Sequence, residues 1–182
     1  MAASLDVLTP EFKEKAQALL ENCKLRGVVM RPNETLRSPF VQARYWRQSR
    51  TIEEIRKKIN ELKQKNALFL AHCLEVVGPQ HGDHVTNAIP GLSWHQWGEA
   101  MDCFWVVNNE AVWSATEVVN GINGYMIYAG EAKKLGLDAG YFWKSFPDIP
   151  HVQLRKASNP AKVFDLLAIN DAMEQTFGNT QP

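Results

Sequence analysis

The chain has 182 residues, 45% hydrophobic and 22% charged, which is an ordinary composition for one globular domain. Lys+Arg and Asp+Glu both number 20, so the net charge is zero and the Lys/Arg excess typical of nucleic-acid-binding proteins is missing. No segment approaches the roughly 18 apolar residues of a membrane span. Residues 1–15 also lack the basic start and apolar run of a signal peptide. We therefore expect synthesis in the cytoplasm, no membrane span and no nucleic-acid partner.

The spacing of the cysteines fits no redox or metal-binding motif. Cys23, Cys73 and Cys103 are odd in number, far apart in the sequence and form no C-x-x-C pair. We predict buried, reduced thiols.

The first predicted element is a helix that begins at Pro10, with Thr9 as its N-cap. Its core positions recur at helical spacing: Phe12, Ala16, Leu19 and Cys23. Gly27 ends the helix, and residues 28–30 read as a short buried strand. A turn at Ser38-Pro39 then leads into a short helix.

Residues 51–77 carry a second helical pattern, with apolar side chains at alternating steps of three and four. The pattern fits one long helix or a helical hairpin broken near Asn66. This segment, at about residues 52–83, is a possible insertion in a single domain that spans residues 1–182. Residues 78–92 are rich in glycine, proline and polar side chains, which predicts a loop.

The second half of the chain mixes strands and helices. Residues 101–107 predict a buried strand, a helix ends before Leu135 with Gly136 as its cap, and residues 151–154 alternate as a short strand. Residues 160–173 predict a last helix. The predicted fold class is α+β: a small antiparallel sheet flanked by helices.

Two of the five histidines lie beside acidic residues. His95 and Asp102 are seven residues apart with Gly98 between them, and Gly98 can take the positive φ that folds the chain back. His151 follows Asp148 at the start of a predicted strand. On spacing alone this pattern is weak, because a histidine followed by an aspartate seven residues later is common by chance.

Two imidazoles and one carboxylate, from His95, His151 and Asp102, are the ligand set of a hydrolytic zinc site that leaves one position for water. Zinc lowers the pKa of that water and polarises a peptide carbonyl. A further carboxylate is needed to take the proton of the water. Asp148 is the first candidate for this base, and Glu99 the second.

Four segments carry a family resemblance. Residues 93–102, SWHQWGEAMD, match every fixed position of the S-x-H-x-x-G-x-A-x-D motif of the family of zinc D-Ala-D-Ala carboxypeptidases and L-alanyl-D-glutamate endopeptidases. Residues 148–153, DIPHVQ, are similar to the second signature of this family, an acid three residues before the last histidine. Residues 36–42 resemble the segment with a substrate-facing arginine, and residues 85–88 also fit. The family includes peptidoglycan peptidases and phage endolysins.

The resemblance implies one zinc ion bound by His95, Asp102 and His151, with Asp148 as general acid/base. It implies that Arg37 stabilises the oxyanion or orients the carbonyl. The substrate-binding candidates that follow are Ser93, Gln42, Trp94 and Trp143, although the tryptophans also suit a core. The residues 139–144, AGYFWK, depart from the glycine-rich stretch of the family, which leaves specificity there open.

The implied function is hydrolysis of peptidoglycan stem peptides by a zinc metallopeptidase, with zinc in an open cleft at the sheet. An L-alanyl-D-glutamate endopeptidase, a cell-wall lysin that acts after release, is the first choice. A D-Ala-D-Ala carboxypeptidase or dipeptidase is the alternative, and a non-catalytic wall-binding module of the same fold is a third. We expect a monomer with a peptidoglycan peptide as its partner.

Other histidines offer competing metal sites. Residues 81–84, HGDH, form a polar cluster that we interpret as a solvated loop, and His72 lies on a predicted helix as a packed or half-exposed residue.

Overall fold

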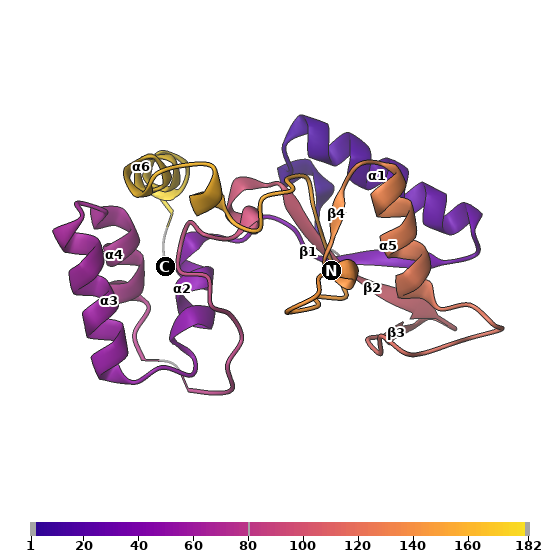
Figure 1. Ribbon diagram of the computed structural model, residues 1–182, viewed down its shortest axis with the longest axis horizontal. Coiled ribbons are helices and arrows are strands. Elements are labelled where there is room, and N and C mark those ends of the chain that lie inside the picture. Colours follow the sequence, from indigo (N-terminus) through magenta and orange to yellow (C-terminus); the bar gives the residue numbers. More distant parts are fainter. Residues whose placement is uncertain (1–2, 80, 181–182) are drawn as a thin grey trace. The chain divides into compact units, whose positions relative to one another are not determined.

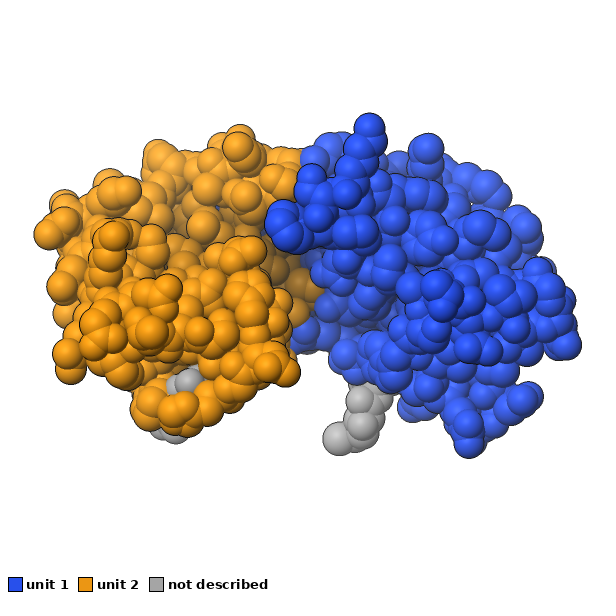
Figure 2. All heavy atoms as spheres, turned by 60° about the horizontal axis from the view of Figure 1, so that its bottom comes forward, with its two compact units in different colours: residues 1–36, 97–156 blue, residues 37–96, 157–182 orange. Residues whose placement is uncertain are grey.

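The computed structural model describes residues 3–79 and 81–180. Contacts within the chain group it into two compact units, residues 1–36 with 97–156 and residues 37–96 with 157–182, coloured separately in Figure 2. The division into a single domain with an insertion stays a prediction. No helix among the described residues is long and apolar enough to cross a bilayer.

The first unit is built on a five-stranded sheet in which every neighbouring pair is antiparallel (Figure 1). The strand order is β1-β2-β5-β4, and β3 pairs with the far end of β2. The bounds are Val29–Glu34 for β1, Ala100–Val107 for β2, Glu110–Val112 for β3, Asp138–Ala139 for β4 and His151–Gln153 for β5. The antiparallel sheet and the α+β class are as predicted.

Two helices, α1 (Pro10–Leu25) and α5 (Gly124–Lys134), pack against this sheet (Figure 1). The four positions of α1 that the sequence assigned to the core are all fully buried: Phe12, Ala16, Leu19 and Cys23. Gly136 follows α5 with a φ of +76°, the left-handed conformation that a helix C-terminus favours.

The alternation of β2 decides which side chains face the helices. Met101, Cys103 and Trp105 belong to the core shared with α1 and α5. Asp102 therefore projects from the opposite face of the sheet, because successive strand residues point to opposite faces. His151 is the partner of Asp102 across the β2–β5 pair and lies on that same face. The sheet thus separates its apolar packing face from a face that carries polar side chains.

The second unit consists of helices. Its elements are α2 (Pro39–Arg47), α3 (Ile52–Gln64), α4 (Leu68–Val76) and α6 (Leu166–Phe177), and α4 packs against the other three. The pattern of residues 51–77 is a hairpin rather than one helix, since Asn66 takes a φ of +57° between α3 and α4. The side-chain oxygen of Asn170 on α6 accepts from the backbone N–H groups of Phe69 and Leu70, which satisfies the first turn of α4.

Two predicted bounds are wrong. The last helix does not run from residue 160 to 173: a short 3-10 turn, Pro160–Lys162, precedes α6, whose N-cap Asp165 accepts from the backbone N–H of Ala168 at 2.8 Å. The strand predicted at residues 28–30 continues to Glu34. Pro32 is tolerated there because, among the described strands, β1 pairs with β2 alone and so lies at the edge of the sheet.

The three cysteines are free and buried, as predicted. Cys23 and Cys103 lie in the core between α1 and the sheet, and Cys73 lies on α4.

Candidate metal centre

His95 lies in a short 3-10 turn, Trp94–Trp97, directly before β2. The turn ends at Gly98, whose φ is +65°, and a side chain there would also press against the carbonyl oxygen of Val7 at 3.2 Å. The predicted reversal at Gly98 is confirmed. The side chain of His95 is only 2% exposed, so the imidazole is held inside the protein.

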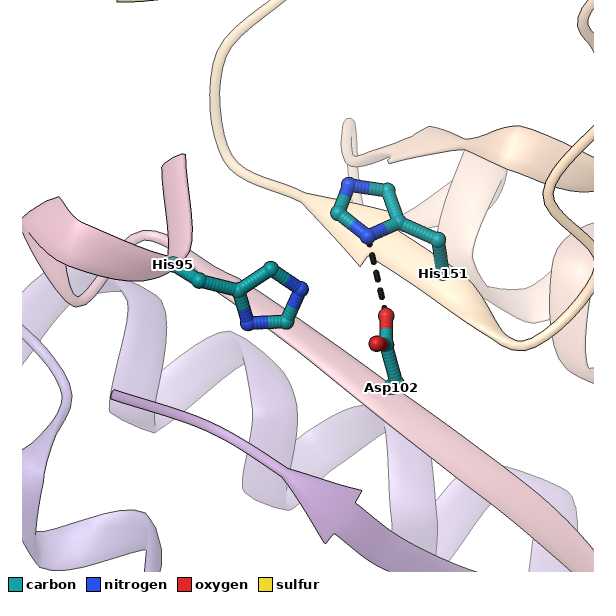
Figure 3. Close-up of side chains that lie close together, drawn as sticks. All are labelled: His95, Asp102 and His151. Atoms are coloured by element: carbon teal, nitrogen blue, oxygen red, sulfur yellow. Dashed lines mark hydrogen bonds and ion pairs between the residues drawn. The ribbon is translucent and has the colours of Figure 1, made fainter. Parts of the chain in front are cut away.

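Asp102 and His151 face each other across β2 and β5. The Nδ1 atom of His151 lies 2.9 Å from Oδ1 of Asp102, and its Nε2 atom lies 3.1 Å from Oε1 of Gln153 (Figure 3). Burial lowers the pKa of His151, but the hydrogen bond and charge of Asp102, with the charge of Asp148, outweigh it and raise the pKa above its ordinary value. The neighbouring carboxylates of Asp102 and Asp148 therefore favour the protonated ring.

The structure brings together the three side chains that the sequence singled out. His95, Asp102 and His151 each offer one ligand atom, and these atoms lie within 4.8 Å of one another. Figure 3 shows the three side chains pointing toward one common space. Two imidazoles and a carboxylate at this separation fit the three protein ligands of a catalytic zinc ion and leave room for water.

Asp148 lies three residues before His151 and has an exposed side chain. Its backbone is fixed on both sides: its carbonyl oxygen accepts from the N–H of His151, and its N–H donates to the carbonyl oxygen of Gly140, each at 3.1 Å. A Cβ atom at residue 140 would lie 2.3 Å from the carbonyl oxygen of Asp148, so only glycine fits there. Gly140 therefore sets the path of the segment that carries the candidate base.

Glu99, the second candidate for the base, has another partner. Both of its carboxylate oxygens accept from the guanidinium of Arg155, at 2.6 and 2.8 Å. This paired geometry is the strong form of an arginine–carboxylate contact. Asp148 is left as the better candidate.

Arg37 begins the second unit beside the first metal-ligand candidate. Its backbone N–H donates to the carbonyl oxygen of His95 at 3.2 Å. Its guanidinium donates to Oε1 of Gln42 at 2.8 Å and lies 5.0 Å from the ring centre of Tyr45. Gln42 is fully buried, and its amide nitrogen donates to the carbonyl oxygen of Ala88 at 2.7 Å. The structure thus places Gln42 behind Arg37 as its acceptor.

The other substrate-binding candidates differ in exposure. Trp94 is 2% exposed and donates from its indole to the carbonyl oxygen of Ala157, which is a core environment. Ser93 is half-buried, and its hydroxyl accepts from the N–H of His95 at 3.4 Å. Trp143 is half-buried with its ring centre 5.2 Å from that of His151. Of the two tryptophan candidates, Trp143 is the one whose ring lies beside a metal-ligand candidate.

The competing histidines lie in exposed positions. His81 and His84 are on an exposed loop, where His84 contacts the side-chain oxygen of Asn87 at 3.0 Å. His72 is exposed on α4, with its ring edge-on to Phe40. Among the described residues, no group of potential metal ligands includes any of these three histidines.

Sequence reasoning missed Gln153 and Gly140. Gln153 is the last residue of the segment that resembles the second signature, but its role depends on strand register and on the partner of its amide. Residues 139–144 depart from the glycine-rich pattern of the family, and Gly140 is the one glycine in that stretch. This single retained glycine was the signal that could have pointed to its role.

A family model matches the part of the chain that carries the site. Residues 86–154 match the family model described as D-alanyl-D-alanine carboxypeptidase. No curated protein sequence matches the chain significantly. Among solved structures, the chain is similar to the L-Ala D-Glu endopeptidase ChiX of Serratia marcescens, with 17% identity, 83% of each chain covered and a TM-score of 0.42, a likeness too remote to transfer an activity.

The matched segment contains His95, Asp102, Asp148 and His151, which are the residues on which the sequence resemblance depends. The resemblance found in the sequence is thereby confirmed: residues 86–154 match the D-alanyl-D-alanine carboxypeptidase family.

Proposed function

We propose that the chain is a zinc-dependent peptidase that hydrolyses peptide bonds in the stem peptides of bacterial peptidoglycan. The observation that carries the proposal is the convergence of His95, Asp102 and His151, whose ligand atoms lie within 4.8 Å of one another. The match of residues 86–154 to a peptidase family supports the reaction class. These three residues would hold one zinc ion.

Zinc in such a site polarises the scissile carbonyl and makes water nucleophilic near neutral pH. The carboxylate of Asp148 takes the proton of the attacking water and gives it to the leaving amine. Its fixed backbone and its charge, close enough to raise the pKa of His151, support this role.

Arg37 donates to the oxygen on which negative charge develops. Its guanidinium is always charged and presents several N–H groups in a fixed plane, which suits an oxyanion. Gln42 holds that plane through its side-chain oxygen. Ser93 and Trp143 line the path of the substrate, and the buried Trp94 supports the turn that carries His95.

Two bonds of the stem peptide are candidates. Cleavage between L-Ala and D-Glu, as by a cell-wall lysin released from the cell, is our first choice, on the sequence resemblance. The family description favours the terminal D-Ala-D-Ala bond as the second.

The test is digestion of purified peptidoglycan with and without a chelator, followed by mass spectrometry of the released fragments. We expect cleavage that the chelator abolishes and zinc restores, and the new amino and carboxyl termini identify the bond. Binding to the wall without any zinc-dependent cleavage would overturn the peptidase and leave a binding module.

A further inference from the structure

The polar face of β5 holds a glutamine whose amide has a determined orientation. Gln153 is 1% exposed, and its Nε2 atom lies 2.6 Å from the backbone carbonyl oxygen of Arg155. A carbonyl oxygen can only accept a hydrogen bond, so the NH₂ group of Gln153 must face Arg155. The side-chain oxygen must then face the other way, toward Nε2 of His151 at 3.1 Å.

This orientation determines which ring nitrogen of His151 keeps its hydrogen when the other nitrogen binds a metal. The amide oxygen of Gln153 is an acceptor only, so Nε2 of His151 must be the donor. The nitrogen left for a metal is then Nδ1, which is the one that faces Asp102 (Figure 3).

The support for Gln153 extends into the first motif. The carbonyl of Arg155 is held in place because its side chain is paired with both oxygens of Glu99, and the neighbouring Leu154 N–H donates to the carbonyl oxygen of Glu99 at 2.9 Å. Ala100 is the register partner of Gln153 and is fully buried.

We propose that Gln153 is a positioning residue of the metal centre: it fixes His151 as the tautomer that binds metal through Nδ1. The inference rests on the proposed zinc site and deepens it. Hydrogen-bond acceptors behind a histidine ligand orient the ring and increase its basicity, and their loss weakens metal binding about 10–100-fold.

The test compares three variants. Gln153→Met keeps the length of the side chain and removes the acceptor, whereas Gln153→Glu keeps an oxygen facing Nε2. Val152→Ala is the matched control, since it removes buried volume from the same strand on the core face. Zinc affinity is measured by competition with a chelating dye.

We expect Gln153→Met to bind zinc about 10–100-fold more weakly than the wild type. Val152→Ala should remain within a few-fold of it, and Gln153→Glu, which keeps the acceptor but loses the donor to Arg155, should lose less affinity than Gln153→Met. Unchanged affinity in Gln153→Met, or an equal loss in Gln153→Glu, would overturn the proposal.

A second measurement needs no variant. Proton–nitrogen correlation spectra of the zinc-loaded wild type, with labelled histidine, show which ring nitrogen of His151 carries the hydrogen. We expect the hydrogen on Nε2 and the metal on Nδ1. Metal on Nε2 together with wall cleavage would overturn only the role of Gln153, whereas metal on Nδ1 without cleavage would overturn only the peptidase.

Discussion

Gly140 and Asp148 are in direct backbone contact. The N–H of Asp148 donates to the carbonyl oxygen of Gly140 at 3.1 Å, and a Cβ atom at residue 140 would lie 2.3 Å from the carbonyl oxygen of Asp148. Because the clash would be with backbone, no side-chain rotation relieves it. The position of the candidate base therefore depends on the absence of a side chain at residue 140.

Replacing Gly140 by alanine should displace Asp148 and reduce the rate of wall-peptide cleavage by at least about tenfold, since small misplacements of a catalytic group are costly. Zinc affinity should stay within a few-fold, because the change lies outside the ligands. Gly130→Ala is the matched control: residue 130 is within α5, where an added Cβ meets nothing within 4 Å. Equal activity of the two variants would show that Gly140 does not position the base.

The separate roles of Asp148 and His151 predict different losses on mutation. Asp148→Asn should keep zinc and lose nearly all activity, because the amide cannot accept the proton of the attacking water. His151→Ala should lose both zinc and activity. Zinc content by atomic spectroscopy, measured beside turnover, separates the two, and equal zinc loss in both variants would assign Asp148 to the metal ligands.

Gln42 should matter through Arg37. Gln42→Met removes the oxygen that accepts from the guanidinium at 2.8 Å and leaves the carbonyl of Ala88 without this donor. We expect a stability loss of about 1–3 kcal/mol and a lower kcat with zinc retained. Gln42→Glu keeps an acceptor for Arg37 and should retain more of kcat. If both variants lose kcat equally, the hydrogen bond to Arg37 is not what Gln42 contributes.

Local sequence rules were sufficient for the convergence of His95 and Asp102. A glycine that permits positive φ, between a histidine and a strand, predicts a reversal, and Gly98 has a φ of +65°. The buried face of α1 could likewise be predicted from the helical spacing of its apolar residues. These features depend on residues close in the sequence.

The orientation of Gln153 and the pairing of Glu99 could not be predicted in this way. Both depend on the register between β2 and β5, strands about fifty residues apart in the sequence. A one-residue change in that register would turn every side chain to the other face. The sequence left open whether a break at Asn66 divides this segment into two helices, for a different reason. The helical spacing of apolar residues continues through Asn66, and only its backbone, with a positive φ, leaves the helical conformation.

The buried thiols should be unreactive in the native protein. Burial raises the pKa of Cys23 and of Cys73 to about 12, and it raises that of Cys103 as well. The cysteine thiols of the unfolded chain have a pKa of about 8.5. Between these pH values the folded chain binds more protons than the unfolded chain, so these groups lower stability as pH rises.

Reaction of the cysteines with a disulfide reagent at pH 8 should therefore be slow in the native protein. After urea unfolds the chain, all three thiols should react. Rapid labelling of any cysteine in the native state would show that its surroundings are more open than the structure indicates.

The capping box of α3 offers a test of stability away from the metal centre. Thr51 accepts from the N–H of Glu54 at 3.2 Å, and the Glu54 carboxylate accepts from the N–H of Thr51 at 2.8 Å. Thr51→Ala removes one of these two bonds and should lower the free energy of unfolding by about 1 kcal/mol. Thr116→Ala, in an exposed turn, is the matched control. In urea titrations we expect a lower midpoint for Thr51→Ala alone with an unchanged slope.

Cleavage of wall peptides at temperatures well below the melting transition should be the same in both variants, because neither residue lies at the metal centre. A loss of activity in Thr51→Ala without a change in the urea midpoint would instead show that the start of α3 contributes to the reaction itself.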